Sequence, residues 1–362
     1  MRAWPWIAVG ALIVLVPTGS PAQVAPYELW VGNQTTDEVF VFDGRTLSLA
    51  ARIPVDTDNT PATSAPHLIT FTPDQRYALV TNVVAPANRN NIVIVDAEGR
   101  RVAAVIPAGP SAHQAVAAPD GRRFWVVNVG ANDLLEVSVQ GAAFTPGRRI
   151  PSGGIRPITL VFSADGRKAY LTNGGSPTGP GSIVVLDAAS GSVLKKWDDL
   201  GREAVSTALS ADGRRVFVDV GFHSANPPAK NDTLFVFDPA TDSIVHQAQL
   251  PHKDLHLMSE APGRGELWIS ARLANQVVVV ETRSGRYQVA AVIATPDKPD
   301  GIAFSPDGSR AFVAHRGIAV TGDPFALTGA QPGFSVIDTA TRRVIGHIPL
   351  DGDIHGLAVR RR

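Results

Sequence analysis

Residues 301–313 have the sequence GIAFSPDGSRAFV, in which a short apolar run, a Ser-Pro-Asp-Gly turn and a second apolar run follow one another. Proline fixes φ at the first corner of such a turn, aspartate bonds its own backbone and glycine accepts positive φ, so the stretch predicts a hairpin between two strands. Degenerate copies begin at Leu68, Gln114, Thr159, Ser206 and Leu257. They predict a protein built from repeated hairpins.

The turns recur at a spacing of roughly 45 residues, which suits four-stranded, WD40-like propeller blades. The turn residues are Asp74, Asp120, Asp165, Asp212, Gly263 and Asp307. Residues 28–55 supply three strands but lack an opening strand, and residues 354–362 are a lone copy of that opening strand. We therefore predict an all-β, seven-bladed β-propeller of four-stranded antiparallel blades, with the first blade closed by the C-terminal strand.

The amino-acid composition of the chain limits the classes of function that it can have. The chain has 362 residues, 44% hydrophobic, with Gly 33 and Pro 28, which suits a large core and many tight turns. Lys+Arg 33 balance Asp+Glu 33, so no general field attracts nucleic acid or an anionic membrane, and nucleic acid is not an expected partner. Cysteine is absent from the sequence, which excludes disulfides and a thiol nucleophile.

The N-terminus has the pattern of a secretory signal peptide. Arg2 precedes an apolar run over residues 3–17, and Ser20-Pro21-Ala22 supplies a small-x-small cleavage pattern. The run is shorter than the roughly 20 apolar residues of a spanning helix. We expect a signal peptide over residues 1–22 and a single propeller domain over residues 23–362. The mature protein would be periplasmic or secreted, without a stable membrane span, and monomeric.

Three second strands of the repeat share a sequence signature. Tyr77-Ala-Leu-Val-Thr-Asn82, Trp125-Val-Val-Asn128 and Tyr170-Leu-Thr-Asn173 resemble the Tyr-Val-Thr-Asn motif of YVTN-type (YncE-like) seven-bladed propellers. The resemblance covers essentially the whole mature chain. It implies a disc of radial sheets around a channel, usually in an exported bacterial protein, in a family that ranges from binding proteins to relatives of haem d1 and lactonase propellers. Asp219, Ala271 and His315 stand where the asparagine is expected.

The longest connections should share one face of the disc. In an up-and-down blade, the connections between the second and third strands all lie on the same side. Four of these connections are long and rich in Gly, Pro and Asn: residues 83–91, 174–181, 221–232 and 317–333. Long loops on a rigid scaffold often carry function, so we expect the binding site on this face.

One position of the repeat is rich in histidine. It lies six residues before the turn proline or its equivalent, and is occupied by His67, His113, Ile158, Val205, His256, Asp300 and His355. Because the first strand of each blade is innermost, these residues should ring the channel mouth, with the five polar ones consecutive. His67, His113, His256 and His355 are candidate ligands for zinc or copper. The alternative is structural, with each histidine bonding a backbone carbonyl.

Further polar residues on the same face could bind a small ligand. These candidates are Arg156, Glu203, His223, Asp300, His315 and Arg316. We expect an exported, non-catalytic propeller that binds a small molecule, a metal ion or a periplasmic protein partner at the channel mouth, because no Gly-x-Ser-x-Gly elbow or cysteine nucleophile is present. The alternative is a metal-dependent or lactonase-like enzyme that uses Asp300 and His355 as acid–base groups.

Overall fold

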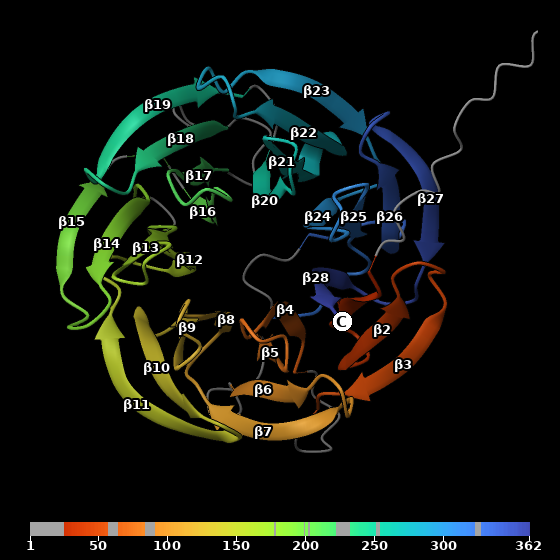
Figure 1. The fold of residues 1–362 in the computed structure, drawn as a ribbon, viewed down its shortest axis with the longest axis horizontal. Helices are drawn as coiled ribbons and strands as arrows, with labels where there is room; N and C mark the ends of the chain where they lie inside the picture. Colours follow the sequence, from red (N-terminus) through yellow and green to blue (C-terminus); the bar gives the residue numbers. More distant parts are fainter. Residues whose placement is uncertain are drawn as a thin grey trace, which may run out of the picture.

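The computed structural model describes residues 25–56, 64–83, 91–176, 179–198, 200–201, 203–221, 232–250, 254–322 and 327–362. The predicted signal peptide and His223 lie outside these ranges. Seven four-stranded antiparallel sheets surround a central axis as the blades of a propeller (Figure 1). Within the described residues the helical content is one short 3-10 turn, Arg272–Ala274. The predicted fold class is therefore confirmed.

The blades follow one another in chain order. The strands of each blade are given from the axis outwards. Blade 1 contains β28 (Ile354–Arg361), β1 (Tyr27–Asn33), β2 (Glu38–Asp43) and β3 (Leu49–Pro54), and blade 2 contains β4 (Pro66–Phe71), β5 (Tyr77–Asn82), β6 (Asn91–Asp96) and β7 (Arg101–Pro107). Blade 3 contains β8 (Ala112–Ala117), β9 (Arg123–Asn128), β10 (Asp133–Gln140) and β11 (Ala143–Pro151). Blade 4 contains β12 (Pro157–Phe162), β13 (Lys168–Asn173), β14 (Ser182–Asp187) and β15 (Val193–Asp198). Blade 5 contains β16 (Ala204–Leu209), β17 (Val216–Val220), β18 (Thr233–Asp238) and β19 (Ser243–Gln249). Blade 6 contains β20 (Leu255–Ala261), β21 (Glu266–Ala271), β22 (Gln276–Glu281) and β23 (Val289–Ala294), and blade 7 contains β24 (Pro299–Phe304), β25 (Arg310–His315), β26 (Gly333–Asp338) and β27 (Arg343–Pro349).

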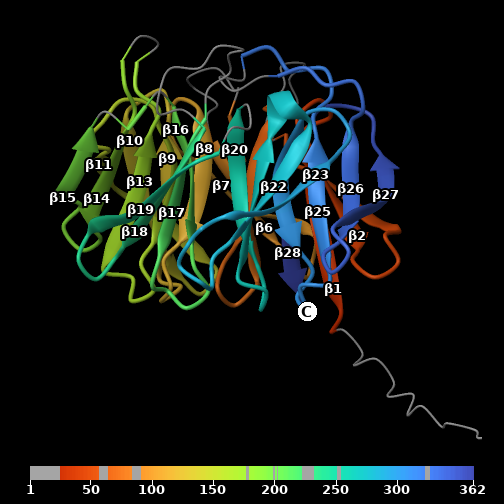
Figure 2. The ribbon, with the colours of Figure 1, turned by 90° about the horizontal axis from the view of Figure 1, so that it is seen from above.

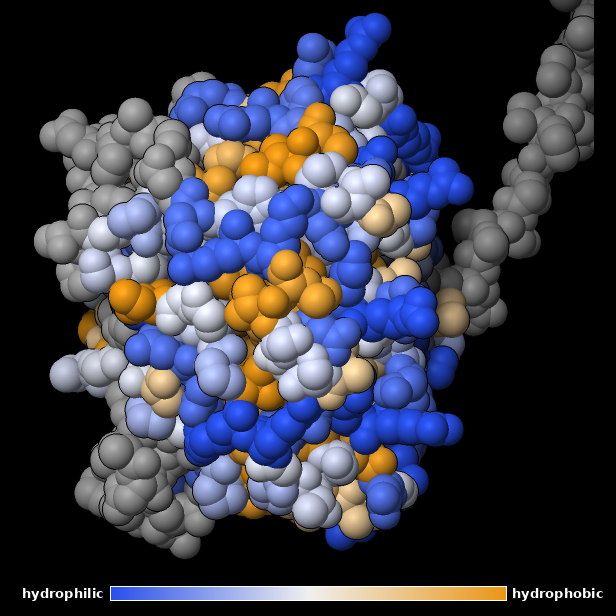
Figure 3. Space-filling view, turned by 90° about the vertical axis from the view of Figure 1, so that its left-hand side faces the viewer, coloured by the Kyte–Doolittle hydropathy of each residue, from blue (hydrophilic) through white to orange (hydrophobic). Residues whose placement is uncertain are grey.

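Burial explains the composition of the strands. Third strands such as β14, with the sequence SIVVLD, are covered on both faces by neighbouring blades and are therefore continuously apolar. Outer strands such as β15 are largely exposed, and Val193 and Leu194 lie on the rim. Figure 3 shows such apolar side chains scattered between polar ones on this rim. Isolated apolar residues of this kind are usual on a protein surface.

The turn chemistry inferred from the repeat is present in the hairpins. Asp165 accepts hydrogen bonds from the Ser163 hydroxyl (2.7 Å) and from the backbone N–H of Arg167 (3.1 Å). Gly166 has φ 68°, a conformation that costs glycine little. In blade 2 the same corner is occupied by Gln75 with φ 60°. Asp74 again bonds the backbone two residues later, which helps to hold this less favourable corner.

Aromatic pairs join neighbouring blades. A tryptophan in the second strand of one blade meets a phenylalanine in the first strand of the next, edge to face. The pairs are Trp30–Phe71 (ring centroids 5.4 Å apart), Trp125–Phe162 (5.1 Å) and Trp268–Phe304 (5.4 Å). Each such contact adds about 0.5–1.5 kcal/mol to the hydrophobic burial of the rings.

The C-terminal strand closes the ring, as predicted. β28 pairs antiparallel with β1, with Leu29 opposite Val359 and Tyr27 opposite Arg361. In the side view, the end of β28, marked C, lies at one face of the disc (Figure 2). Closure removes the open edge that β1 would otherwise expose. It also fixes His355, near the start of β28, beside residues from blades 2 and 7.

Candidate metal centre

The seven ring positions lie at a backbone irregularity near the start of each innermost strand. In β4 the pairing register shifts between Pro66 and Ile69, and in β24 it shifts between Pro299 and Ile302. Bulges of this kind redirect side chains. All seven side chains are buried, which agrees with a common position around the axis.

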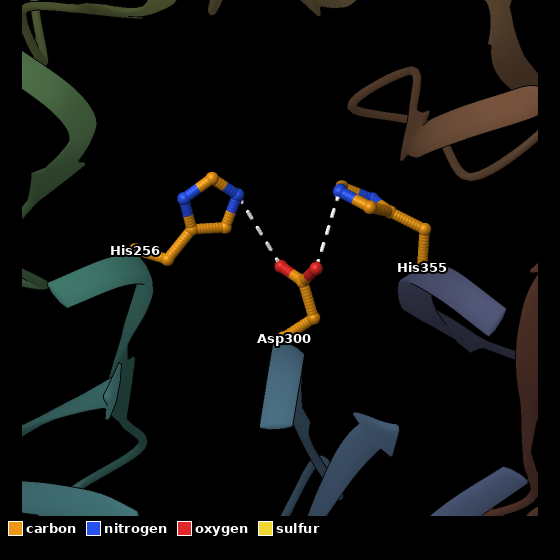
Figure 4. A group of neighbouring side chains, drawn as sticks. All are labelled: His256, Asp300 and His355. Carbon is orange, nitrogen blue, oxygen red and sulfur yellow. Dashed lines mark ion pairs between the residues drawn. The ribbon is translucent and has the colours of Figure 1, made fainter. Parts of the chain in front are cut away.

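Three of these residues form a possible metal site. His256 from β20, Asp300 from β24 and His355 from β28 each offer one ligand atom, and these atoms lie within 4.8 Å of one another. His256 Nε2 is 3.4 Å from Asp300 Oδ1, and His355 Nε2 is 3.4 Å from Asp300 Oδ2 (Figure 4). Ligands about 2.0–2.1 Å from a tetrahedral ion are separated by roughly 3.3–3.4 Å. The two histidines thus face different oxygens of one carboxylate, each at a separation close to that between two ligands of one ion.

The orientation of His355 supports this role. Its Nδ1 lies 3.3 Å from the backbone carbonyl of His67, which can only accept, so Nδ1 carries the proton. Burial, together with the charges of Arg316 and Arg272, lowers the pKa of His355 well below 6.5, so the ring is neutral. The lone pair is then on Nε2 and faces Asp300. Two acceptors in this arrangement repel each other unless a cation lies between them, and a carbonyl-oriented imidazole is typical of metal ligands.

His67 is held in the other tautomer. Gln34 Oε1 accepts a hydrogen bond from Arg316 Nη2 (3.2 Å), so its amide nitrogen faces His67 Nδ1 at 2.7 Å and donates to it. Burial and nearby positive charge lower the pKa of His67 well below 6.5. A neutral His67 therefore carries its proton on Nε2 in this arrangement, and ligation through that atom would require the other tautomer.

The predicted histidines do gather around the axis. His67 stacks on His355 with ring centroids 3.7 Å apart, and His67 and His113 are 4.4 Å apart. The centroids of His256 and His355 are 6.1 Å apart. On the apolar side of the ring, Ile158 and Val205 pack with Val129. The channel mouth thus has one polar and one apolar side, as the sequence pattern indicated, while ligation by His67 and His113 stays a prediction.

Two buried arginines surround the carboxylate. Arg316 Nη1 is 3.2 Å from Asp300 Oδ2, and the same guanidinium contacts Asp353 at 2.6 and 2.8 Å. Arg272 Nη1 is 3.8 Å from Asp300 Oδ2, and Arg272 pairs with Asp254 at 2.9 Å. Three carboxylates against two guanidiniums leave the cluster one negative charge. A divalent cation would therefore enter a site of complementary charge.

Comparison with known proteins agrees with this fold. No protein-family model matches the chain. It is 24% identical over 304 residues to the uncharacterized protein YncE of Salmonella typhimurium, a match that covers 83% of this chain and 69% of that protein. YncE of Salmonella typhi matches to the same extent. The chain is a distant homologue of the YncE proteins.

Other relatives of this YncE homologue are more remote. Antigen Lp49 of Leptospira interrogans is 22% identical over 232 residues, which cover 64% of this chain and 48% of the antigen. Among solved structures, a Kuenenia stuttgartiensis hydrazine synthase chain superposes with a TM-score of 0.68 at 18% identity, over 90% of this chain and 99% of that one. The dihydro-heme d1 dehydrogenase NirN superposes with a TM-score of 0.57 at 16% identity, over 91% and 74%. These structural likenesses concern the fold alone.

The remaining predicted ligand-binding residues are distributed differently in the YncE homologue. Arg156 and Glu203 pair with each other at 3.3 Å, between blades 4 and 5. His315 is buried, contacts the Ser335 hydroxyl (2.8 Å) and the Asp297 carbonyl (3.1 Å), and burial lowers its pKa to about 4. Arg316, by contrast, belongs to the channel cluster. His223 lies outside the described residues.

The sequence pattern did not point to Arg272, Asp353 and Gln34 in this cluster. A signal for Arg272 existed, because it follows the last residue of β21 just as Arg316 follows the last residue of β25. The pairing register also corrects one alignment. Asp219 is opposite Leu234, as Thr172 is opposite Ile183, so Asp219 occupies the threonine position and Val220 the asparagine position. Asp219 therefore does not stand where asparagine is expected.

In the part of the chain that the structure describes, no helix has the length and apolar character needed to cross a membrane.

Proposed function

We propose that this YncE homologue is an exported, non-catalytic propeller that binds a divalent transition-metal ion, zinc or copper, at the channel mouth through His256, Asp300 and His355. The observation that carries the proposal is the lone pair of His355 Nε2, which faces the Asp300 carboxylate at 3.4 Å because Nδ1 is committed to a backbone carbonyl. Mixed imidazole and carboxylate ligands favour zinc or copper over calcium or magnesium.

The other parts of this proposal come from the sequence. Export rests on the pattern of residues 1–22, and a monomer, periplasmic or secreted, is the expected state. A small molecule or a periplasmic protein could bind through the metal or beside it. Metal-dependent catalysis is the second candidate, because three protein ligands leave a coordination position open. A lactonase-like variant would use Asp300 and His355 as the acid–base pair.

Isothermal titration calorimetry of the purified, chelator-treated protein with zinc and with copper tests the metal site. We expect one ion per chain, and His256→Ala or Asp300→Asn should weaken binding at least roughly 100-fold, because each removes a direct ligand. The matched control is Ile158→Ala, which changes an apolar residue at the same ring position. His67→Ala and His113→Ala ask whether these histidines also ligate. Unchanged affinity in both His256→Ala and Asp300→Asn would refute the site.

A further inference from the structure

A groove lies on the face of the disc opposite the metal centre. It is formed where blades 4 and 5 meet, by the hairpin turns that follow β12 and β16 and by the turn after β18, whereas the ring residues lie at the other end of the innermost strands. Figure 1 shows these two blades as neighbours. The groove measures about 640 Å³. This volume is in the range of small-molecule sites.

The walls of the groove carry excess positive charge. Its cationic lining residues are Arg167, Lys168, Arg214 and Arg215, and its acidic lining residues are Asp165 and Asp238. Four cationic and two acidic side chains thus line the groove, and two further carboxylates, Asp242 and Asp212, act on Lys168 and Arg214. The floor and sides also include Pro239, Ala164 and Ala240, which offer apolar surface to a carbon skeleton.

Two of the four cationic side chains already form ion pairs and hydrogen bonds within the fold. Lys168 Nζ pairs with Asp242 at 2.6 Å and donates to the Pro239 carbonyl at 3.1 Å. Arg215 lies 3.6 Å from Asp238 and donates to the Tyr287 hydroxyl at 3.2 Å. These contacts join blade 4 to blade 5 and blade 5 to blade 6.

Arg167 and Arg214 form no such contact between blades. Their guanidinium groups make no hydrogen bond or ion pair with any residue in the described ranges. Each lies near the aspartate of its own turn, but Asp165 is already held by the Ser163 hydroxyl, and Asp212 by that of Ser210. The two arginines thus attract the carboxylates of their own turns, and their exposed guanidiniums donate no hydrogen bond to a described residue.

Some cations at other turns of the propeller make contacts within the fold. Arg76, which follows the turn of blade 2, lies over the Tyr77 ring, 5.0 Å from its centroid. Between blades 1 and 2, Arg100 spans the gap by donating to the Ala50 carbonyl and pairing with Glu28. The groove between blades 4 and 5 combines open volume with guanidiniums that are not engaged in this way.

We propose that this groove is a binding site for a small organic anion, with Arg167 and Arg214 as the side chains that recognise its acidic group. A guanidinium presents planar, paired N–H donors that match a carboxylate or a phosphate. The shared chemistry is therefore a phosphate or carboxylate group attached to a compact skeleton. The site is separate from the metal centre and does not depend on it.

Calorimetric titrations of the metal-free protein with inorganic phosphate and, separately, with succinate test the site. Binding of phosphate but not succinate assigns a phosphorylated ligand, and the reverse assigns a carboxylate. Arg167→Gln and Arg214→Gln should each weaken the binding of the preferred probe at least about tenfold, because each removes charge-assisted hydrogen bonds. Both residues are exposed, so the variants should keep the parent's circular dichroism spectrum and melting temperature.

Arg122→Gln is the matched control. Arg122 is also exposed and follows the turn of blade 3 at the equivalent position, but it does not line the groove. Its substitution should leave the affinity within about twofold of the parent. The proposal is overturned if neither probe binds, or if Arg122→Gln weakens binding as much as the groove variants, which would indicate a general charge effect.

Discussion

Asp219 lies at a repeat position that other blades fill with threonine or serine, and its hydrogen bonds differ from theirs. In blades 2, 4 and 6 the equivalent residue is Thr81, Thr172 or Ser270, whose hydroxyl accepts a backbone N–H of its own blade. Thr81 and Thr172 also donate to a carbonyl of the next blade, at 2.7 and 3.0 Å. Asp219 accepts the N–H of Ser206 at 3.0 Å, but its Oδ2 has no hydrogen-bond partner within the described residues. An ionised carboxylate cannot supply the second, donated bond.

Asp219→Asn should therefore stabilise the protein at neutral pH. Burial raises the pKa of Asp219 well above 3.8, so the folded state opposes its ionisation. The stability that this carboxyl contributes is fully present below pH 3.8 and is lost as the pH rises through the higher folded pKa. We expect the free energy of unfolding of the variant at pH 7 to exceed that of the parent by at least about 1 kcal/mol, with a smaller gap at pH 4.

Urea unfolding at the two pH values measures this difference. Asp198→Asn is the control, because Asp198 is exposed and pairs with Lys196 on the surface, so its removal should change stability by less than about 1 kcal/mol. A parent that is more stable than Asp219→Asn at pH 7 would show that the carboxylate has a stabilising partner.

At the scale of elements, the closure of blade 1 depends on charge as well as on strand pairing. Glu28 in β1 is buried and contacts Arg360 of β28 at 3.2 Å, Arg100 of blade 2 at 2.7 Å and the C-terminal residue Arg362. Burial raises the pKa of Glu28, but hydrogen bonds from Arg100, Trp30 and Arg360 outweigh it and hold the pKa below 4.5. One carboxylate thus links β1 and β28 to the neighbouring blade.

Glu28→Gln should lower the free energy of unfolding by about 3 kcal/mol at pH 7, because it leaves the buried guanidinium of Arg360 without this counter-charge. Since the pKa of Glu28 is lowered, its contribution is present above pH 4.5 and is lost as the pH falls through the folded pKa, so the effect should shrink in acid. Denaturant titrations at pH 7 and at pH 3.5 measure it. Glu38→Gln, which breaks the exposed pair with Arg52, should cost under about 1 kcal/mol, and an equal cost in both variants would contradict the closure argument.

For the molecule as a whole, the repeat determined how much of the fold and of the candidate site could be predicted from the sequence. Hairpin turns at a constant spacing predicted the blades, and counting from those turns placed His256, Asp300 and His355 at equivalent positions, which the structure brings together. The partners of Asp300 were harder to foresee. Arg272 contacts it from blade 6 and Arg316 from the end of β25 in its own blade, and both contacts depend on side-chain conformations that spacing does not determine.

The tautomers of His67 and His355 could not be predicted from the sequence either. The repeat makes His67 and His355 equivalent, yet one receives a hydrogen bond from Gln34 and the other faces a backbone carbonyl. These opposite hydrogen bonds assign a lone pair to His355 Nε2 and a proton to His67 Nε2. A ring of equivalent residues can therefore contain both metal ligands and hydrogen-bond donors, and the difference depends on neighbours outside the ring.

We propose above that His256, Asp300 and His355 hold one transition-metal ion. Anomalous diffraction at the zinc edge, from crystals of the chelator-treated protein soaked in zinc, tests it most directly. We expect one strong peak on the axis-facing side of β20, β24 and β28, about 2.0–2.1 Å from His256 Nε2, His355 Nε2 and one carboxylate oxygen of Asp300. A peak coordinated elsewhere with none at this triad, or a triad that shows no anomalous signal at saturating zinc, would contradict it.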